Sequence, residues 1–355
     1  MFGAEPCFAL AASVCIGTIV SAQTGTNPSN SEPTKSRDQF KNVRVLGDMP
    51  ADQMGKVMNM MSASLGVNCS YCHEGTNFAV ENVGHKDVAR SMISMTLQMN
   101  QAHFGGAAQV TCNTCHRGQA IPNSLISTNL PIGRSSPSKN VTEGNSAKEV
   151  LAKFDKARGG TAKITAIKNR HVIAERVEPN GKTEPEELWQ AADGRSRMVT
   201  LYGNTIVAEG FDSKNTWKSV NDQPIVLKVD EGEQIQREAQ IAMGVDLHSV
   251  YKEIAFESRV DWLGRPADVL RGVSFNLNEE RLYFDVENGL LVKRTAQVPT
   301  VLGAFEYEVL YKDYREYAGV LHPTRLEFAV PNIRWARQVS EIKCNSLLDE
   351  KLFRP

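Results

Sequence analysis

The chain has 355 residues, of which 41% are hydrophobic and 23% are charged, and its formal net charge at pH 7 is −1. This composition is typical of a soluble globular protein with room for two domains. The near-neutral charge argues against a nucleic-acid-binding surface and against a polybasic membrane patch.

The N-terminus has the features of an export signal. Residues 8–20 form an apolar run that is too short for a comfortable membrane span, and a small-residue cleavage site follows before Gln23. The residues ahead of the run include Glu5 and no Lys or Arg, which leaves a cytoplasmic protein with a buried apolar terminus as the alternative. We expect a cleaved signal peptide over residues 1–22, a flexible tether over residues 23–37 and a periplasmic mature chain.

Two helices are expected in the next segment. Asp48–Pro50 has the residues of a helix start, with a capping residue followed by proline, and Gly66 is expected to end that helix. A second helix is expected from His85 to about His103, where the pair Gly105-Gly106 would end it. A loop and a cysteine motif follow each helix, which makes a loose internal repeat.

The cysteine motif is Cys-x-x-Cys-His, and it occurs at Cys69–His73 and again at Cys112–His116. In this pentapeptide the two thiols add across the vinyl groups of haem, and the histidine reaches the iron from one face. A thioredoxin-type redox pair and a zinc site built from two halves are the rival interpretations, but neither explains the histidine that follows each pair. We therefore expect two covalently bound haem c groups, attached through Cys69, Cys72, Cys112 and Cys115, with His73 and His116 as iron ligands.

The second axial ligand of each iron is less clear from the residues alone. A methionine thioether is a soft, neutral ligand that raises the potential, whereas a second histidine lowers it. One helical methionine is more often a core residue than a ligand, so the choice stays open at this point. The candidates are Met54, Met58, Met60 and Met61 before the first motif, and Met92, Met95, Met99 and His103 before the second.

Several motifs between Phe40 and Pro122 occur together in one known family. They are Lys41–Leu46, Met58, Cys69–His73, Ala89–Thr96 and Val110–Gly118. In this combination the segment resembles the cytochrome c subunit of purple-bacterial photosynthetic reaction centres. The resemblance implies a helical haem domain that transfers electrons, in which each iron takes a methionine from the preceding helix. Those methionines fall on Met58 and Met92, with Met61 and Met95 as alternatives.

The chain departs from that family in the number of haem motifs. The family's subunit carries four haems, whereas no Cys-x-x-Cys-His follows His116. We therefore expect a dihaem electron carrier between a redox donor and a redox acceptor, with a membrane-bound reaction centre or respiratory complex as a candidate partner. A dihaem peroxidase is the enzymatic alternative, and it would need an open iron position with an acid–base group nearby.

The rest of the chain differs from the haem-motif segment in its composition and in its pattern of apolar residues. Residues 123–146 are rich in Pro, Ser, Asn and Gly and are expected to form a linker, and helices are expected at Ala147–Arg158 and Glu231–Met243. Asn288-Gly289 is a strong hairpin signal. Alternating residues predict strands at Ala162–Ile167, Arg195–Leu201, Arg281–Val286, Leu290–Thr295, Phe305–Tyr311 and Arg325–Val330.

The expected fold class is α+β, with a mainly helical dihaem cytochrome c domain over residues 38–122 and a mostly antiparallel β domain over residues 147–355. The hairpin at Phe284–Arg294 and the closing strands faintly resemble periplasmic lipoprotein-carrier domains, in which a half-open barrel wraps around a helix. The resemblance implies a concave sheet that could hold a hydrophobic ligand, such as an acyl chain or a quinone tail. The alternative is a packing or docking domain with a filled core.

Overall fold

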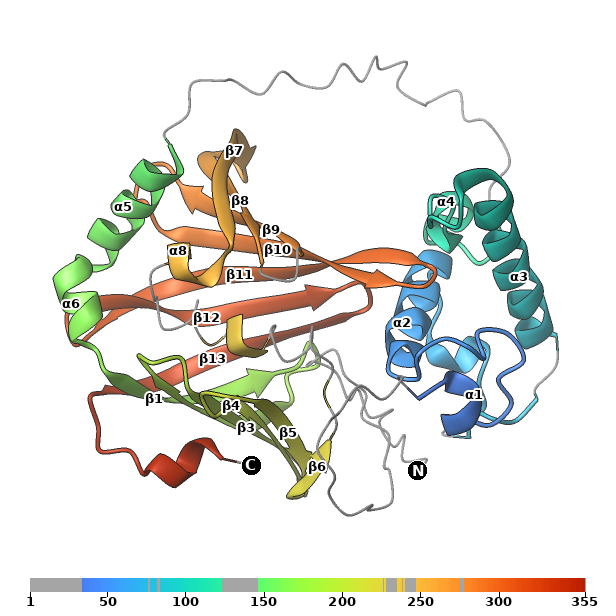
Figure 1. The fold of residues 1–355 in the computed structure, drawn as a ribbon, viewed down its shortest axis with the longest axis horizontal. Helices are drawn as coiled ribbons and strands as arrows, with labels where there is room; N and C mark the ends of the chain where they lie inside the picture. Colours follow the sequence, from blue (N-terminus) through green and yellow to red (C-terminus); the bar gives the residue numbers. More distant parts are fainter. Residues whose placement is uncertain are drawn as a thin grey trace. The chain divides into compact units, whose positions relative to one another are not determined.

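The computed structural model describes residues 34–75, 77–81, 84–122, 146–225, 227, 235–237, 239, 247–274 and 278–354. The expected signal peptide and most of the expected tether, linker and Glu231–Met243 helix lie outside these residues. The chain divides into two compact units (Figure 1). Unit 1 contains the chain up to Ile132 together with Val298–Phe305 and Pro331–Ile333, and unit 2 contains the remainder.

Unit 1 is helical in its described N-terminal part. Its elements are α1 (Ser36–Gln39), α2 (Gln53–Leu65), η1 (Cys69–Tyr71), α3 (His85–Phe104) and α4 (Cys112–His116). Gly66 and Gly105 end α2 and α3 in the left-handed conformation, with φ of 66° and 61°, as the sequence predicted.

The predicted start of the first helix is wrong. The helix begins at Gln53 and not next to Asp48–Pro50. The amide of Ser36 donates to the carbonyl of Met49, and the amide of Ala51 donates to Thr34, so backbone groups near Pro50 pair with an extended segment. This pairing holds the residues out of helical geometry until Gln53.

Unit 2 is built on an antiparallel sheet, which confirms the predicted α+β class with a large antiparallel sheet. The described strands are β1 (Asn169–Val177), β2 (Thr183–Ala191), β3 (Ser196–Tyr202), β4 (Thr205–Phe211), β5 (Thr216–Val220), β6 (Gln223–Ile225), β7 (Glu253–Trp262), β8 (Arg265–Val273), β9 (Glu279–Asp285), β10 (Leu291–Thr300), β11 (Gly303–Tyr317), β12 (Val320–Val330) and β13 (Ile333–Cys344). The strand order across the sheet is β6-β5-β4-β3-β2-β1-β13-β12-β11-β10-β9-β8-β7. Strands that follow each other in sequence are therefore neighbours in the sheet, except that β1 pairs with β13, and β6 and β7 lie at opposite edges.

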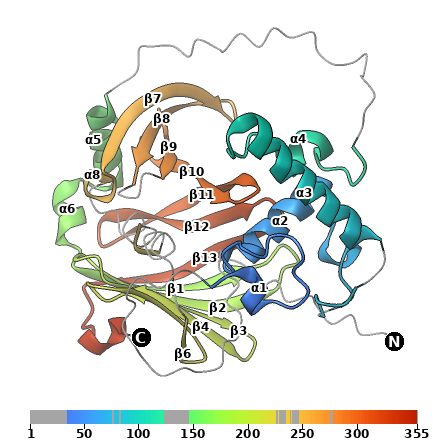
Figure 2. The ribbon, with the colours of Figure 1, turned by 45° about the vertical axis from the view of Figure 1, so that its right-hand side comes forward.

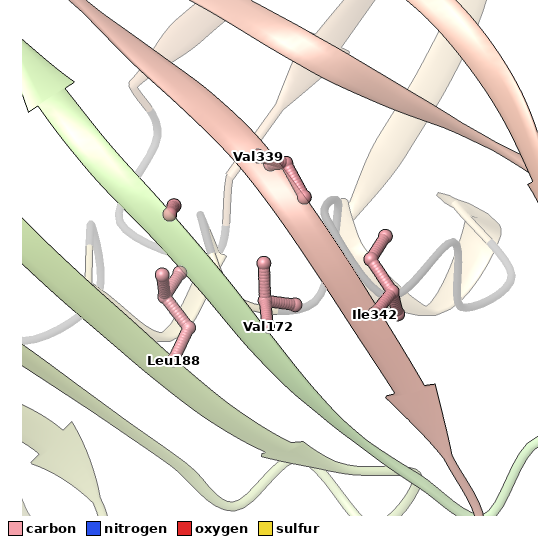
Figure 3. Packing of buried hydrophobic residues seen from close by; sticks show 5 residues of the cluster. Val172, Leu188, Val339 and Ile342 are labelled. Carbon is pink, nitrogen blue, oxygen red and sulfur yellow. The ribbon is translucent and has the colours of Figure 1, made fainter.

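The crossing from β1 to β13 contains a hydrophobic core cluster. Val172 of β1 lies opposite Ile342 of β13 on one side and Leu188 of β2 on the other. Val339 packs in the same cluster (Figure 3). Residues that alternate along three strands therefore bury their side chains on one face of the sheet, which is the pattern of a half-buried strand.

Two helices of unit 2, α5 (Ala147–Arg158) and α6 (Thr161–Ala166), lie next to each other at one end of its sheet (Figure 2). Ser146 caps α5 through a reciprocal bond with Glu149, and Phe154 meets Phe284 of β9 edge to face at 5.3 Å. Two short helical elements, α8 (Leu247–Val250) and η2 (Glu350–Phe353), complete the described part of the unit. None of the helices in the described ranges is long and apolar enough to cross a membrane.

The expected strand at Ala162–Ile167 is wrong, because these residues form α6 (Thr161–Ala166). Ile164 and Ile167 are three residues apart and both pack against Val320, so one helical turn places them on one face. The other five predicted strands fall within or overlap β3, β9, β10, β11 and β12, and the Asn288-Gly289 turn joins β9 to β10.

Candidate haem-attachment sites

The first Cys-x-x-Cys-His motif folds into a single tight turn. The carbonyl of Cys69 accepts hydrogen bonds from the amides of Cys72 and His73, at 3.3 and 3.0 Å. Both cysteines are free thiols, with Cys69 exposed and Cys72 half-buried. The turn therefore presents two thiols and one imidazole from five consecutive residues, which is the donor set that covalent haem attachment requires.

The imidazole of His73 is partly enclosed by the loop that follows it. Phe78 meets the ring edge to face at 5.1 Å, and burial together with the nearby Lys86 ammonium lowers the pKa of His73 below its usual value. The ring is therefore neutral at pH 7, which is the form that ligates a metal. Its Nδ1 atom is buried and has no hydrogen-bond partner among the described residues.

Lys86 of α3 fastens this loop. Its Nζ donates to the carbonyl of Phe78 at 3.1 Å and also to the carbonyl of Val80. The side chain is buried although it carries a charge, and the carbonyl groups compensate part of its lost hydration. Lys86 thus determines how the chain passes over His73.

The second motif forms the short helix α4, which Thr111 caps through a reciprocal arrangement with Thr114. His116 Nδ1 lies 2.9 Å from the carbonyl oxygen of Gln119, so Nδ1 carries the proton and donates. This bond leaves the lone pair on Nε2, the nitrogen that is then available to an iron. The two motifs differ here, because the corresponding nitrogen of His73 has no such partner in the described part of the chain.

The segment before the second motif is held by α3. Asn100 is buried, and its side chain donates to the Val110 carbonyl at 2.7 Å and accepts from the Val110 amide at 2.9 Å. Beyond the motif, the Gly118 amide donates to the carbonyl of Ser64 in α2 at 2.8 Å. Hydrogen bonds therefore connect the segments on either side of the second motif to α3 and to α2.

The methionines that are candidates for distal ligands differ in how exposed they are. Val88, Met92, Met95 and Met99 form an exposed apolar stripe on α3, with Met92 40% exposed. On α2, Met60 is only 5% exposed, whereas Met58 and Met61 are partly buried. The assignment of Met58 and Met92 as ligands stays a prediction.

The histidines outside the motifs have ordinary structural surroundings. His85 begins α3, stacks on Tyr71 at 4.2 Å, and its Nδ1 lies 2.9 Å from the Tyr71 carbonyl. His103 is exposed in the last turn of α3. Within the described residues no three side chains of His, Cys, Asp or Glu gather closely enough to hold a metal ion.

The residues of unit 1 fit haem attachment. Each motif offers one exposed thiol, one half-buried thiol and one imidazole, and unit 1 also exposes several large apolar side chains. Such side chains are available to cover the apolar surface of a porphyrin. They are Tyr71, Phe78, Val88, Met92, Met95, Leu97, Met99 and Phe104.

A charged network that the sequence did not single out connects the family motifs. Arg90 of α3 pairs with Glu81 at 2.9 Å and with Asp87 at 2.8 Å, and Arg44 pairs with Glu81 at 2.7 Å. The guanidinium of Arg90 and the amide of Asn42 hold the pKa of Glu81 at about 2. Arg44 and Arg90 lie in two of the segments that the chain shares with the family, Lys41–Leu46 and Ala89–Thr96. Their presence in these shared segments was the signal in the sequence that could have indicated the network.

Comparisons with known proteins agree with the resemblance seen in the sequence. Residues 17–155 match the sequence model of the family described as photosynthetic reaction centre cytochrome C subunit. The photosynthetic reaction center cytochrome c subunit of Roseobacter denitrificans is 36% identical over 107 residues, which are 27% of this chain and 29% of that protein. The corresponding subunit of Rubrivivax gelatinosus is 34% identical over 29% of this chain and 28% of its own length. Cytochrome c-554 of Chloroflexus aurantiacus is 34% identical over 24% of this chain and 21% of its own length.

Solved structures similar to this chain cover a larger share of it. The LolA superfamily protein NE2245 of Nitrosomonas europaea covers 59% of this chain and 98% of its own length, with 15% identity and a TM-score of 0.43. A putative outer membrane lipoprotein-sorting protein domain of Vibrio parahaemolyticus gives 11% identity and a TM-score of 0.40, covering 59% of this chain and 94% of its own length. At these scores the similarity assigns no ligand to the sheet. The haem-motif segment, residues 17–155, is the part of the chain that is similar to the photosynthetic reaction centre cytochrome c subunits.

Proposed function

We propose that this protein is an exported c-type cytochrome that carries electrons through two covalently bound haem c groups. The observation that supports this most strongly is the shape of the two motifs, each of which gathers two free thiols and one imidazole into a single turn. Bound haem supplies reversible one-electron chemistry of its iron. The chain's own residues attach the group, select its ligands and control its access to water.

Each motif residue has a separate task in this proposal. Cys69 and Cys72 anchor one haem and Cys112 and Cys115 the other, while His73 and His116 ligate the two irons. The Gln119 carbonyl keeps His116 in the tautomer with a free Nε2 and fixes the orientation of its ring. Burial keeps His73 neutral.

The distal ligands in the proposal are Met58 and Met92. Met92 lies on the exposed stripe of α3, where a bound porphyrin would cover it. On α2, Met60 is almost completely buried, which leaves Met54, Met58 and Met61, and the family resemblance selects Met58 among these three. A thioether in the sixth position closes the iron to small ligands, which favours electron transfer over peroxide chemistry.

The proposed partners are a redox donor and a redox acceptor in the periplasm. The relatives that match residues 17–155 include subunits of photosynthetic reaction centres, so a membrane-bound reaction centre or a respiratory complex is the proposed type of partner. The chain matches only about 29% of the length of such a relative, and the choice between these complexes is part of the proposal.

Haem stoichiometry and an absorption spectrum test this function on protein made in a host competent for cytochrome c maturation. We expect two covalent haems per chain and the weak far-red charge-transfer band of methionine-ligated ferric haem. The band should lose about half of its intensity in Met58→Leu and in Met92→Leu, because each variant removes one ligand. Met99→Leu on the same stripe is the control and should keep the full band. Absence of covalent haem would refute the proposal, and rapid peroxide turnover would replace it with the peroxidase.

A further inference from the structure

The tip between β10 and β11, residues Val298–Phe305, belongs to unit 1 although almost two hundred residues separate it from the haem motifs. None of its eight side chains is charged, and Leu302 is 1% exposed. Leu302, Gly303 and Phe305 are buried whereas Pro299 and Ala304 are exposed, so one side of the tip has a packing partner.

The tip packs on α2. The amide of Val301 donates to the side-chain oxygen of Gln53 at 3.1 Å. The hydroxyl of Thr300 donates to the Gly303 carbonyl at 2.7 Å, which closes the turn, and lies 3.7 Å from the sulfur of Met60. The tip therefore covers the buried methionine of the helix that precedes the first haem motif.

The tip also reaches the second haem motif. A Cβ atom added at Gly303 would lie 2.7 Å from Cγ2 of Thr111, the residue that caps α4 immediately before Cys112. Gly303 has a φ of 130°, which side-chain-bearing residues rarely adopt. Glycine at this position is thus required both by the backbone and by the close approach to Thr111.

We propose that the tip Val298–Phe305 is a redox-tuning wall for the haem attached through Cys112 and Cys115, an inference that rests on the proposed function. Ferric haem carries one more positive charge than ferrous haem, and replacing water by uncharged protein destabilises the form with the greater charge. The uncharged tip beside α4 therefore raises the potential of this haem. The tip also packs on α2, but its tightest approach is to Thr111, so a change at Gly303 is expected to act on the second haem.

A potentiometric titration of the full haem-loaded chain tests the proposal with Gly303→Ala. The added methyl group pushes the tip away from Thr111 and admits water, so the potential of one haem falls. We expect a shift equivalent to about a tenfold change in its ratio of reduced to oxidised form, or about 59 mV for a one-electron couple. Gly289→Ala is the matched control, because Gly289 also has a positive φ, of 75°, and a close neighbour, Lys153, but lies in unit 2.

Single-haem variants identify which haem responds. The Gly303→Ala shift should persist when Cys69 and Cys72 are replaced by Ala, and should vanish when Cys112 and Cys115 are replaced. If Gly303→Ala does not fold, Thr300→Val opens the same turn by removing the hydroxyl bond, and the same lower potential is expected.

The outcomes separate the two proposals. Two haems per chain with unchanged potentials in both tip variants would overturn the redox-tuning wall and leave the proposed function intact. Equal shifts in Gly303→Ala and Gly289→Ala would also overturn it, because the effect would then be a general loss of stability. Wild-type protein without covalent haem would overturn both.

Discussion

At the scale of single residues, buried polar side chains that bond to backbone groups decide the local geometry of this protein. Lys86 and Asn100 both lie on α3, and each holds a segment next to a haem motif. Removing such a side chain leaves backbone groups buried without partners, which costs about 1–3 kcal/mol per group. The haem motifs therefore depend on residues that have no part in haem chemistry.

A buried histidine of unit 2 gives the chain a defined dependence on pH. His322 is 1% exposed, and its Nδ1 accepts a hydrogen bond from Arg170 at 2.8 Å. Burial, with the positive charges of Arg170 and Arg158 nearby, lowers the pKa of His322 from 6.5 to about 2. The folded chain thus keeps this ring neutral, whereas the unfolded chain protonates it below about pH 6.5.

We predict that this group destabilises the fold as the pH falls below about 6.5, by up to about 1.4 kcal/mol per pH unit until the folded pKa is reached. His322→Asn keeps an acceptor for Arg170 without the titration, so its stability should fall less steeply between about pH 7 and pH 5. Urea denaturation at several pH values measures how steeply the free energy of unfolding changes with pH in each variant. His171→Asn on β1, which β13 separates from β12, is the control, and equal slopes in wild type and His322→Asn would contradict the prediction.

At the scale of elements, the end of α2 is where unit 1 tolerates least change. Gly66 has a φ of 66°, and a Cβ atom there would overlap the carbonyl group of Gly118, whose amide is bonded to Ser64. Gly105 ends α3 with a φ of 61°, but a Cβ atom there would meet nothing within 4 Å. The two glycines share one backbone conformation and differ only in how closely another segment approaches.

Gly66→Ala should therefore destabilise the protein much more than Gly105→Ala. In the control variant Gly105→Ala the free energy of unfolding falls only by the cost of an alanine in the left-handed conformation, about 1–2 kcal/mol. Gly66→Ala has the same cost and also forces the second motif away from α2. Thermal unfolding and the haem content of the second motif are the measurements. Equal melting temperatures in the two variants would show that the contact between Gly66 and Gly118 contributes nothing.

The sequence predicted the elements whose signals are local. Glycine after an apolar helical stretch located the ends of α2 and α3, and Asn288-Gly289 located a hairpin. It failed where distant pairing overrides a local pattern. The segment before Gln53 bonds to residues 34–36. The segment of α6 has an alternation typical of a strand, but Ile164 and Ile167, the residue after the helix, pack in one cluster with Val320. The roles of Lys86 and Asn100 depend on burial, which no short pattern reveals.

At the scale of the whole molecule, the two units reach stability by different means. In unit 2 the pairing of β1 with β13 joins residues more than 150 positions apart, and a hydrophobic cluster is buried where the two strands meet. No motif in the sequence predicted that pairing. In the described part of unit 1 few apolar side chains are fully buried, among them Val57, Met60 and Ile93, while the stripe on α3 is exposed. A small unit that buries so little apolar surface is marginally stable by itself.

Haem attachment should therefore stabilise unit 1 selectively, because a group that binds only the folded form shifts the folding equilibrium toward it. We predict that protein made without cytochrome c maturation unfolds in two calorimetric transitions, and that haem raises the lower one and leaves the upper one unchanged. His322→Asn should alter the pH dependence of the upper transition alone, since His322 lies in β12 of unit 2. A single transition that moves as a whole with haem would mean that the two units unfold together and would contradict this assignment.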